Sequence, residues 1–219
     1  MTYIKFLEPL EKKLIKKYGD SFPPIITISG LSGSGKGTHA ALLQMNIRKH
    51  LGLIMEIHES GQFFREVARD MGYNEARLGD FSKKVASSET LAKKIDHEIE
   101  RKTLEKMFDG GGIFVGRLTF ATIGDMGYKI MLKVDPQIVA QRIVADPTRD
   151  EYEQSVGEAR AQIIKRDTND VKRYEKLYKI NYEELSQKCD LIIENTGTIQ
   201  ETEKKIFDEA SLWLLKSKL

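Results

Sequence analysis

A glycine-rich segment near the start of the chain places the strongest constraint on its fold. The run Ile25–Ser29 leads directly into Gly30-Leu31-Ser32-Gly33-Ser34-Gly35-Lys36-Gly37-Thr38, and a helical pattern follows over 40–51. Glycine adopts backbone conformations that other residues avoid, so this density of glycines predicts a tightly curved turn. A buried strand, a tight turn and a helix in this order are typical of a parallel sheet in an α/β protein.

The spacing within this segment also predicts a ligand. Gly30, Gly35 and Lys36 form the G-x4-G-K frame of a Walker A loop. In such a loop, successive backbone N–H groups point inward at a phosphate, and the start of the following helix adds its positive end. Lys36 supplies a mobile cation for the β- and γ-phosphates. We therefore expect a nucleoside triphosphate site. A flexible strand–helix turn is the alternative, and the loop alone does not separate a GTPase-like switch from a small-molecule kinase.

Further apolar runs predict the rest of the sheet, because each is too short for an amphipathic helix and several contain adjacent β-branched residues. They are Leu53–Ile57, Ile113–Val115, Ile130–Val134 and Leu191–Ile193. Helix starts lie between them. Asp135-Pro136 opens a helix through about Ala145, and Ser155…Glu158 and Thr198…Glu201 each fit a capping box. We expect a P-loop α/β domain of three α/β/α layers with a five-stranded parallel sheet.

Composition excludes several classes of protein. The 219 residues carry 35 basic and 33 acidic side chains, which argues against a chain that coats nucleic acid or membrane. The one cysteine, Cys189, excludes an internal disulfide framework and a cysteine-rich zinc site. No apolar run approaches the roughly 18 residues that a membrane span needs. We expect a cytoplasmic monomer. The final Ser217-Lys218-Leu219 spells the peroxisomal tripeptide, but three residues specify little.

The first 24 residues form a separate segment in the sequence pattern. Met1–Tyr18 is lysine-rich and amphipathic, and Gly19-Asp20 and Pro23-Pro24 close it before the first strand. A basic amphipathic helix can bind a membrane surface or a partner. Because Glu8 and Glu11 dilute the basic face, we favour an extra helix packed on the flank of the sheet. Residues 1–24 are thus expected to be a helical extension of a domain that spans residues 25–219.

A second motif follows the second predicted strand. The stretch 59–65, Glu-Ser-Gly-Gln-Phe-Phe-Arg, resembles the Ser-x-Gly-x-x-[Phe/Tyr]-Arg-like turn of nucleoside monophosphate kinases, and the archaeal-type cytidylate kinases most of all. Gly37, where Ser or Thr usually follows the lysine, is similar to the loop of adenylate and bacterial cytidylate kinases. The resemblance implies that Ser60 and Gly61 lie at a helix start and that Arg65 points at the acceptor phosphate. A surface arginine paired with an acidic neighbour is the alternative.

Two further elements match the cytidylate kinase pattern. Gly116 and Arg117 follow the third predicted strand, at the edge where open α/β sheets bind ligands, but the acid that the family carries beside this pair is absent. Arg166, Asp170 and Arg173 are spaced i, i+4, i+7 and share one face of a helix. Two guanidinium groups around a carboxylate suit a substrate with a ribose and phosphates. A solvated ladder of ion pairs is the alternative.

The resemblance implies a lid over about residues 142–160, a short segment that brings arginines over the transferring phosphoryl group. Arg142, Arg149 and Arg160 are its candidate arginines. It also implies that Asn195-Thr196, after the last predicted strand, borders the donor adenine.

A helical insertion for the acceptor is implied over about residues 59–108. Asp96 and Arg101 match an Ile-Asp-x-Glu-Ile-x-Arg stretch of the archaeal-type family and are candidates for contacts to the acceptor nucleotide. Exposed helix charges are the alternative for both. The resemblance further implies ATP and Mg²⁺ as cofactors, with Thr38 as the candidate loop ligand of the metal ion.

These motifs together favour a nucleoside monophosphate kinase that phosphorylates CMP or dCMP and whose partners are small-molecule nucleotides. A kinase for AMP, UMP or another small phosphorylated molecule remains open, as does a non-catalytic nucleotide-binding protein. The candidate catalytic residues are Lys36, Arg142, Arg149, Arg160, Arg166 and Arg173. The candidate ATP-binding residues are Gly30, Ser32, Gly33, Ser34, Gly35, Lys36, Gly37, Thr38, Asn195 and Thr196. The candidate acceptor-binding residues are Ser60, Gly61, Arg65, Asp96, Arg101, Gly116, Arg117, Arg166, Asp170 and Arg173.

Overall fold

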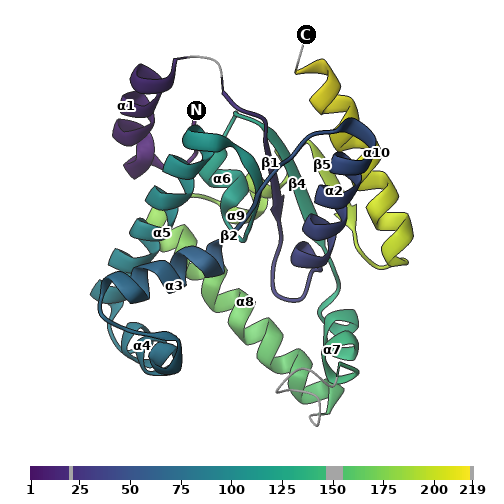
Figure 1. Ribbon diagram of the computed structural model, residues 1–219. Coiled ribbons are helices and arrows are strands. Elements are labelled where there is room, and N and C mark those ends of the chain that lie inside the picture. Colours follow the sequence, from purple (N-terminus) through teal and green to yellow (C-terminus); the bar gives the residue numbers. More distant parts are fainter. Residues whose placement is uncertain (20–21, 147–154, 218–219) are drawn as a thin grey trace.

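The computed structural model describes residues 1–19, 22–146 and 155–217. Within these residues one five-stranded sheet runs in the order β2-β3-β1-β4-β5, and every neighbouring pair of strands is parallel (Figure 1). The expected sheet is confirmed. Its strands are β1 (Ile25–Ser29), β2 (Ile57–Glu59), β3 (Gly112–Gly116), β4 (Tyr128–Lys133) and β5 (Leu191–Glu194).

Helices connect the strands and flank them. The two short 3₁₀ helices are η1 (Lys5–Leu7) and η2 (Glu75–Arg77). The α-helices are α1 (Glu8–Tyr18), α2 (Lys36–Leu51), α3 (Ser60–Asp70), α4 (Leu78–Ala86), α5 (Glu89–Gly110), α6 (Thr119–Ile123), α7 (Pro136–Val144), α8 (Val156–Tyr178), α9 (Tyr182–Ser186) and α10 (Ile199–Lys216).

Both faces of the sheet are covered. On one face α2 and α10 pack together and bury Leu43 and Ile206 against the strands. On the other face α5, α6 and α8 surround a second core that includes Phe108, Phe120 and Tyr174. Figure 1 shows α2 and α10 on one side of the strands and α1, α5 and α6 on the other. The predicted three-layer α/β/α arrangement is therefore confirmed.

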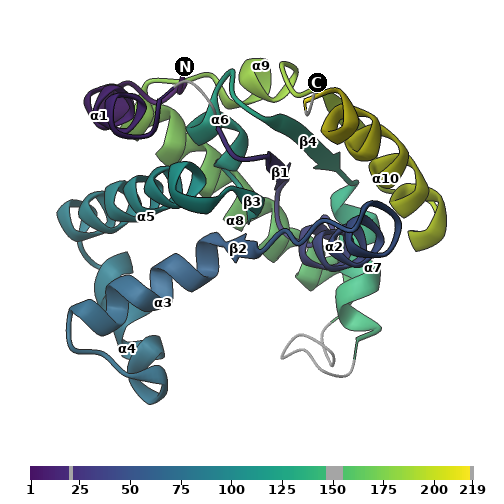
Figure 2. The ribbon, with the colours of Figure 1, turned by 45° about the horizontal axis from the view of Figure 1, so that its top comes forward.

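The helical segment between β2 and β3 has a small core of its own. Phe63 and Val67 of α3 pack there with Phe81 of α4 and Ile95 of α5. Both ribbon views show α3 and α4 extending beyond the edge of the sheet at β2 (Figures 1 and 2). This segment thus forms a projecting arm beside the end of the sheet.

One predicted strand is wrong in its position. The sequence predicts a strand over Leu53–Ile57, but β2 begins only at Ile57, where its ladder with Ile113 of β3 starts. Ile54 is 83% exposed, so the apolar run is not buried along its whole length. The apolar pattern alone did not locate the register, which the partner strand sets.

Three predicted helix starts are confirmed by their caps. The carboxylate of Asp135 accepts from the Gln137 N–H at 2.6 Å, and α7 ends at Val144, one residue before the predicted end. The Ser155–Glu158 and Thr198–Glu201 pairs both form reciprocal capping boxes. These local contacts position α7, α8 and α10 around the edge where the strands end.

The N-terminal segment packs on the same face as α5 and α6. The Tyr3 N–H donates to Ala121 O at 2.9 Å, and the buried Glu11 carboxylate accepts from the Thr2 N–H at 2.8 Å. Ile4 and Leu7 are fully buried in the core of that face. These contacts support a packed extension over a free surface helix. None of the helices in the described residues is long and apolar enough to span a membrane.

Candidate active site

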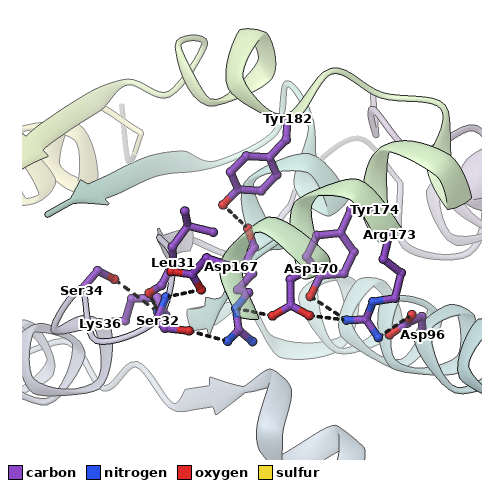
Figure 3. Close-up of polar contacts among 11 residues, drawn as sticks. Leu31, Ser32, Ser34, Lys36, Asp96, Asp167, Asp170, Arg173, Tyr174 and Tyr182 are labelled. Carbon is purple, nitrogen blue, oxygen red and sulfur yellow. Dashed lines mark hydrogen bonds and ion pairs between the residues drawn. The ribbon is translucent and has the colours of Figure 1, made fainter. Parts of the chain in front are cut away.

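The loop after β1 curves around the start of α2. Gly33 and Gly35 have φ of 65° and 85°, a left-handed region that glycine adopts without the usual penalty. The Lys36 ammonium donates to Leu31 O at 2.7 Å and to Ser34 Oγ at 3.2 Å (Figure 3). Burial, and then the neighbouring Arg117, lower the pKa of Lys36 to about 8. An anion in the loop would raise this pKa again, because its negative charge would stabilise the ammonium form.

An open cleft of about 390 Å³ lies between this loop and the start of α3. Gly37 and Thr38 are exposed on its α2 side, and Glu59, Ser60 and Gly61 line the other side. The cleft therefore presents hydroxyl and carboxylate oxygens next to the Walker A loop.

Gly116 is required where β3 reaches this cleft. A Cβ at that position would lie 2.2 Å from the Ser60 hydroxyl oxygen. Since no side chain fits there, β3 and the start of α3 can approach closely and place Arg117 beside the cleft.

A continuous chain of polar contacts runs from the loop to the projecting arm (Figure 3). Arg117 Nη2 donates to Ser32 Oγ at 2.9 Å, and Arg117 Nε lies 3.3 Å from Asp170 Oδ2. The other oxygen of Asp170 accepts from Arg173 Nη2 at 3.0 Å, and Arg173 Nη1 lies 3.1 Å from Asp96 Oδ2. Because these side chains come from the loop, β3, α8 and α5, the chain brings four separate segments together.

The far end of this chain is buried and acidic. Burial raises the pKa of Asp96 to about 6, although the adjacent Arg173 acts in the opposite direction. One turn further along α5, burial raises the pKa of Glu100 to about 7, and the Thr122 hydroxyl donates to its carboxylate. The carboxyl groups of Asp96 and Glu100 are therefore protonated at higher pH than exposed carboxyl groups are.

Arg166 lies beside the cleft described above, at a neighbouring cavity that shares Gly33, Lys36 and Arg117 with it. This second cavity has a volume of about 260 Å³. Three cationic side chains therefore converge on the space beside the loop. Such a concentration of positive charge suits a transferring phosphoryl group.

Arg65 lies on the exposed face of α3, one turn after its start. Its Nη1 atom would be 3.7 Å from a Cβ placed on Gly61, so the side chain folds back toward the helix N-terminus. Asp70 instead pairs with Lys102 at 3.3 Å, and Glu66 accepts from a glutamine of its own helix. The Arg65 guanidinium thus lies near Gly61, a residue that lines the cleft.

Arg101 is not brought to this cluster. It pairs with Glu98 at 2.8 Å and Glu105 at 2.7 Å on the exposed surface of α5. Five residues separate it from Asp96, which at 3.6 residues per turn places the two side chains on different faces of the helix.

The residues expected in the lid are only partly described. Arg142, on α7, donates from Nη2 to Asn195 O at 3.0 Å, and Arg160 is exposed in the first turns of α8. Arg149 and the middle of the expected lid, residues 147–154, lie outside the described residues. Thr196 is exposed after β5, whereas the Asn195 side chain is buried beneath the Walker A loop.

The family is decided by comparison of the sequence with known proteins. The Cytidylate kinase-like family matches residues 25–197. The chain belongs to this family. The cytidylate kinase of Methanopyrus kandleri is 32% identical over 186 residues, covering 80% of this chain and 86% of that protein. The cytidylate kinase of Thermococcus kodakarensis is 35% identical over 169 residues, covering 77% of this chain and 78% of that protein.

A more distant kinase of known structure has a similar fold to this cytidylate kinase-like chain. The structure of shikimate kinase from Bacteroides thetaiotaomicron matches with a TM-score of 0.57 at 13% identity. It covers 87% of this chain and 98% of the shikimate kinase. At this identity the match supports the α/β fold alone.

The sequence analysis missed two residues that support the site of this cytidylate kinase-like chain. Asp167 is buried and accepts from the Ser32 N–H at 3.1 Å, and the Tyr182 hydroxyl donates to Arg117 O at 3.1 Å. Asp167 precedes the buried Tyr174 by seven residues and could have been assigned to the same helix face. Tyr182 had no such signal, because only the turn after α8 returns it to Arg117.

Proposed function

We propose that this protein is an ATP-dependent nucleoside monophosphate kinase whose acceptor is CMP or dCMP. The observation that carries the proposal is the chain Ser32–Arg117–Asp170–Arg173–Asp96, which joins a Walker A loop to acceptor-side arginines. Membership of the Cytidylate kinase-like family, and curated relatives named cytidylate kinase, support the choice of acceptor. The partners are then small nucleotides, and the cytoplasm is the expected site of action.

The donor triphosphate is assigned to the loop between β1 and α2. Its backbone N–H groups and the N-terminus of α2 would bind the phosphates, and Lys36 would contact the β- and γ-phosphoryl oxygens. The oxygen-rich cleft beside Thr38 and Glu59 fits Mg²⁺, which prefers oxygen ligands and is held largely by substrate phosphates. Bound Mg²⁺ would neutralise negative charge on the triphosphate.

The acceptor monophosphate is assigned to the opposite side of the same cleft. Ser60 and Gly61 would offer the N-terminus of α3 to its phosphate, with Arg65 and Arg117 as charged partners. Asp170, which lies between Arg117 and Arg173, would accept the ribose hydroxyls. The acceptor would thus take part in the polar chain that the side chains already form.

The chemistry requires little covalent participation from the protein. An oxygen of the acceptor phosphate attacks the γ-phosphorus of ATP, a new P–O bond forms, and the bond to the β–γ bridging oxygen breaks. The attacking oxygen is already an anion at neutral pH, so alignment and neutralisation of charge provide the rate enhancement. Lys36, Arg117 and Arg166, which line one cavity beside the loop, would neutralise this charge.

A coupled assay of ADP release with ATP·Mg²⁺ tests this proposal. The panel contains CMP, dCMP, UMP, AMP and GMP, and a reaction without acceptor measures ATP hydrolysis. We expect CMP and dCMP to give the largest acceleration. A strong preference for another base would refute the assigned acceptor. No stimulation by any monophosphate, with ATP still bound, would leave a non-catalytic nucleotide-binding protein.

A further inference from the structure

Asn195, directly after β5, is the point where several parts of the donor site meet. Its backbone N–H donates to Lys133 O at 2.7 Å, and its backbone carbonyl accepts from Arg142 Nη2 at 3.0 Å. The residue is thereby fixed to the end of β4 and to α7. Its side chain points away from these contacts into the interior below the Walker A loop.

Every polar atom of the buried side chain has a partner. Nδ2 donates to Ser34 O at 3.0 Å and lies 3.2 Å from His39 Nε2. Oδ1 accepts from the hydroxyl of Thr202, a buried residue of α10, at 3.0 Å. The amide therefore ties the Walker A loop to α2 and α10, and both N–H groups of its NH₂ are already engaged within the protein.

The partners also determine how the amide is oriented. Ser34 O can only accept a hydrogen bond, so the atom that faces it must be the NH₂ group of Asn195. The second N–H of that group then points at His39, whose Nε2 must act as the acceptor. The neutral imidazole of His39 consequently carries its proton on Nδ1.

The loop itself is shaped around this amide. Ser34 lies between Gly33 and Gly35, whose φ values of 65° and 85° are in the left-handed region. A Cβ on Gly35 would lie 2.8 Å from Asn195 Nδ2, so the glycine at this position leaves room for the amide. The bond to Ser34 O thus holds the part of the loop that is most costly to order.

We propose that Asn195 is a positioning residue for the donor site, which fixes the Ser34 carbonyl so that the loop N–H groups point at the triphosphate. The identity of the donor rests on the function proposed above. Asn195 acts through the loop and does not contact the nucleotide. Thr202 supports it by holding the amide oxygen. Loss of the amide would therefore weaken ATP binding and leave the acceptor side, on the other side of the cleft, largely unchanged.

Equilibrium binding of ATP·Mg²⁺ without any acceptor tests the proposal. We expect Asn195→Ala to raise the Kd for ATP about 10- to 100-fold, as loss of the hydrogen bonds that order a binding loop would. Thr202→Val should give a smaller increase, because the two Nδ2 contacts remain. Asn74→Ala, an exposed asparagine far from the loop, serves as the control and should leave the Kd unchanged. A folded Asn195→Ala protein with the wild-type Kd for ATP would overturn the proposal.

Steady-state kinetics separate positioning from a general structural role. The KM for ATP should rise in both variants, whereas the KM for CMP should change less than threefold. Equal increases in both KM values would overturn the proposal. If the wild-type protein binds ATP but phosphorylates no monophosphate, the proposed function fails, and the binding experiment still decides the role of Asn195.

An NMR measurement on the unmodified protein keeps the proposal testable if Asn195→Ala does not fold. The ¹⁵N chemical shifts of His39 should report an unprotonated Nε2 and a protonated Nδ1, and Thr202→Val should shift both. A proton on Nε2 in the wild-type protein would contradict the orientation of the Asn195 amide and with it the proposal.

Discussion

The donor loop and the acceptor-side cluster lie next to each other but are built in different ways. The loop is one uninterrupted segment between β1 and α2, and its lysine bonds to the carbonyl of Leu31 and the hydroxyl of Ser34 within that segment. The cluster takes Arg117 from the end of β3, Asp170 from α8 and Asp96 from α5. The donor loop itself is therefore local in sequence, although Asn195 supports it from a distance, and the acceptor-side cluster depends throughout on the packing of distant elements.

The charges of the two regions differ as well. Lys36 is bonded to neutral oxygens, so an incoming triphosphate would supply its first direct anionic partner among the described contacts. On the acceptor side, Arg173 contacts both Asp170 and Asp96. An acceptor would have to share these arginines with carboxylates. On the donor side, then, burial lowers the pKa of a lysine that has no direct anionic partner among the described contacts. On the acceptor side, the arginines are already paired with carboxylates.

Substitution of the loop lysine should have the largest effect. Lys36→Met removes the cation that follows the transferring phosphoryl group, and we expect kcat/KM to fall on the order of 10³-fold. Steady-state assays with ATP and CMP measure it. Lys49→Met, an exposed lysine in the last turn of α2, is the matched control and should keep activity. A loss below tenfold for Lys36→Met would contradict the assigned donor site.

Leu7→Ala should destabilise the face that carries the acceptor cluster. Leu7 is fully buried in the core shared with α5 and α8, so we expect the free energy of unfolding to fall by about 2–5 kcal/mol. Urea unfolding measures this change, and Leu212→Ala on the exposed side of α10 should cost far less. The KM for ATP of the folded protein should stay at its wild-type value. An unchanged midpoint would show that the extension is not part of this core.

Asp170→Ala should act on one substrate. Loss of the carboxylate between Arg117 and Arg173 should raise the KM for CMP roughly 10- to 100-fold, the range of a charged hydrogen bond. The KM for ATP should change less than threefold. The control is Asp208→Ala, whose partner Lys204 lies on the exposed surface of α10. Equal effects on both substrates would remove Asp170 from the acceptor site.

Glu100→Gln should change how the free energy of unfolding depends on pH, because Glu100 is a buried acid next to the acceptor-side cluster. Burial raises the pKa of Glu100 to about 7 from an ordinary value of 4.5, so its contribution to stability is present below pH 4.5 and is lost as the pH rises to 7.

At pH 8 we expect the Gln variant to be more stable than wild type on the order of 1–3 kcal/mol, and at pH 4.5 nearly equal. Thermal unfolding across this pH range measures the difference, and the exposed Glu184→Gln is the control. A variant less stable than wild type at pH 8 would show that Glu100 is ionised and paired.

Features encoded by neighbouring residues could be predicted from the sequence. The Walker A loop needs glycines at fixed spacing, and the caps at Asp135, Ser155 and Thr198 need a polar side chain followed by N–H groups within three residues. The Arg166–Asp170–Arg173 spacing also identified one helix face correctly in part, since Asp170 and Arg173 do pair. In each case the interacting groups lie within two helical turns.

Features set by distant partners could not be predicted. The position of β2 depends on its ladder with β3. The contact of Asp96 depends on Arg173, which lies on another helix. The contact of Tyr182 with Arg117 depends on the turn after α8. The family resemblance implies that Asn195 borders the donor adenine, and the sequence holds no sign that its side chain lies under the loop, where Thr202 holds it. In each case the contacting residue lies in a distant segment, so the local sequence pattern does not identify it.

The fate of the γ-phosphoryl group is the most direct test of the whole account. ³¹P NMR of a reaction with ATP, Mg²⁺ and CMP follows each phosphorus atom separately, and the same reaction with Lys36→Met is the reference. We predict that the ATP γ signal disappears as the β-phosphate signal of CDP grows, only with the wild-type protein. Growth of inorganic phosphate in place of CDP, or no change while ATP is bound, would contradict the assignment of donor and acceptor to the two sides of this cleft.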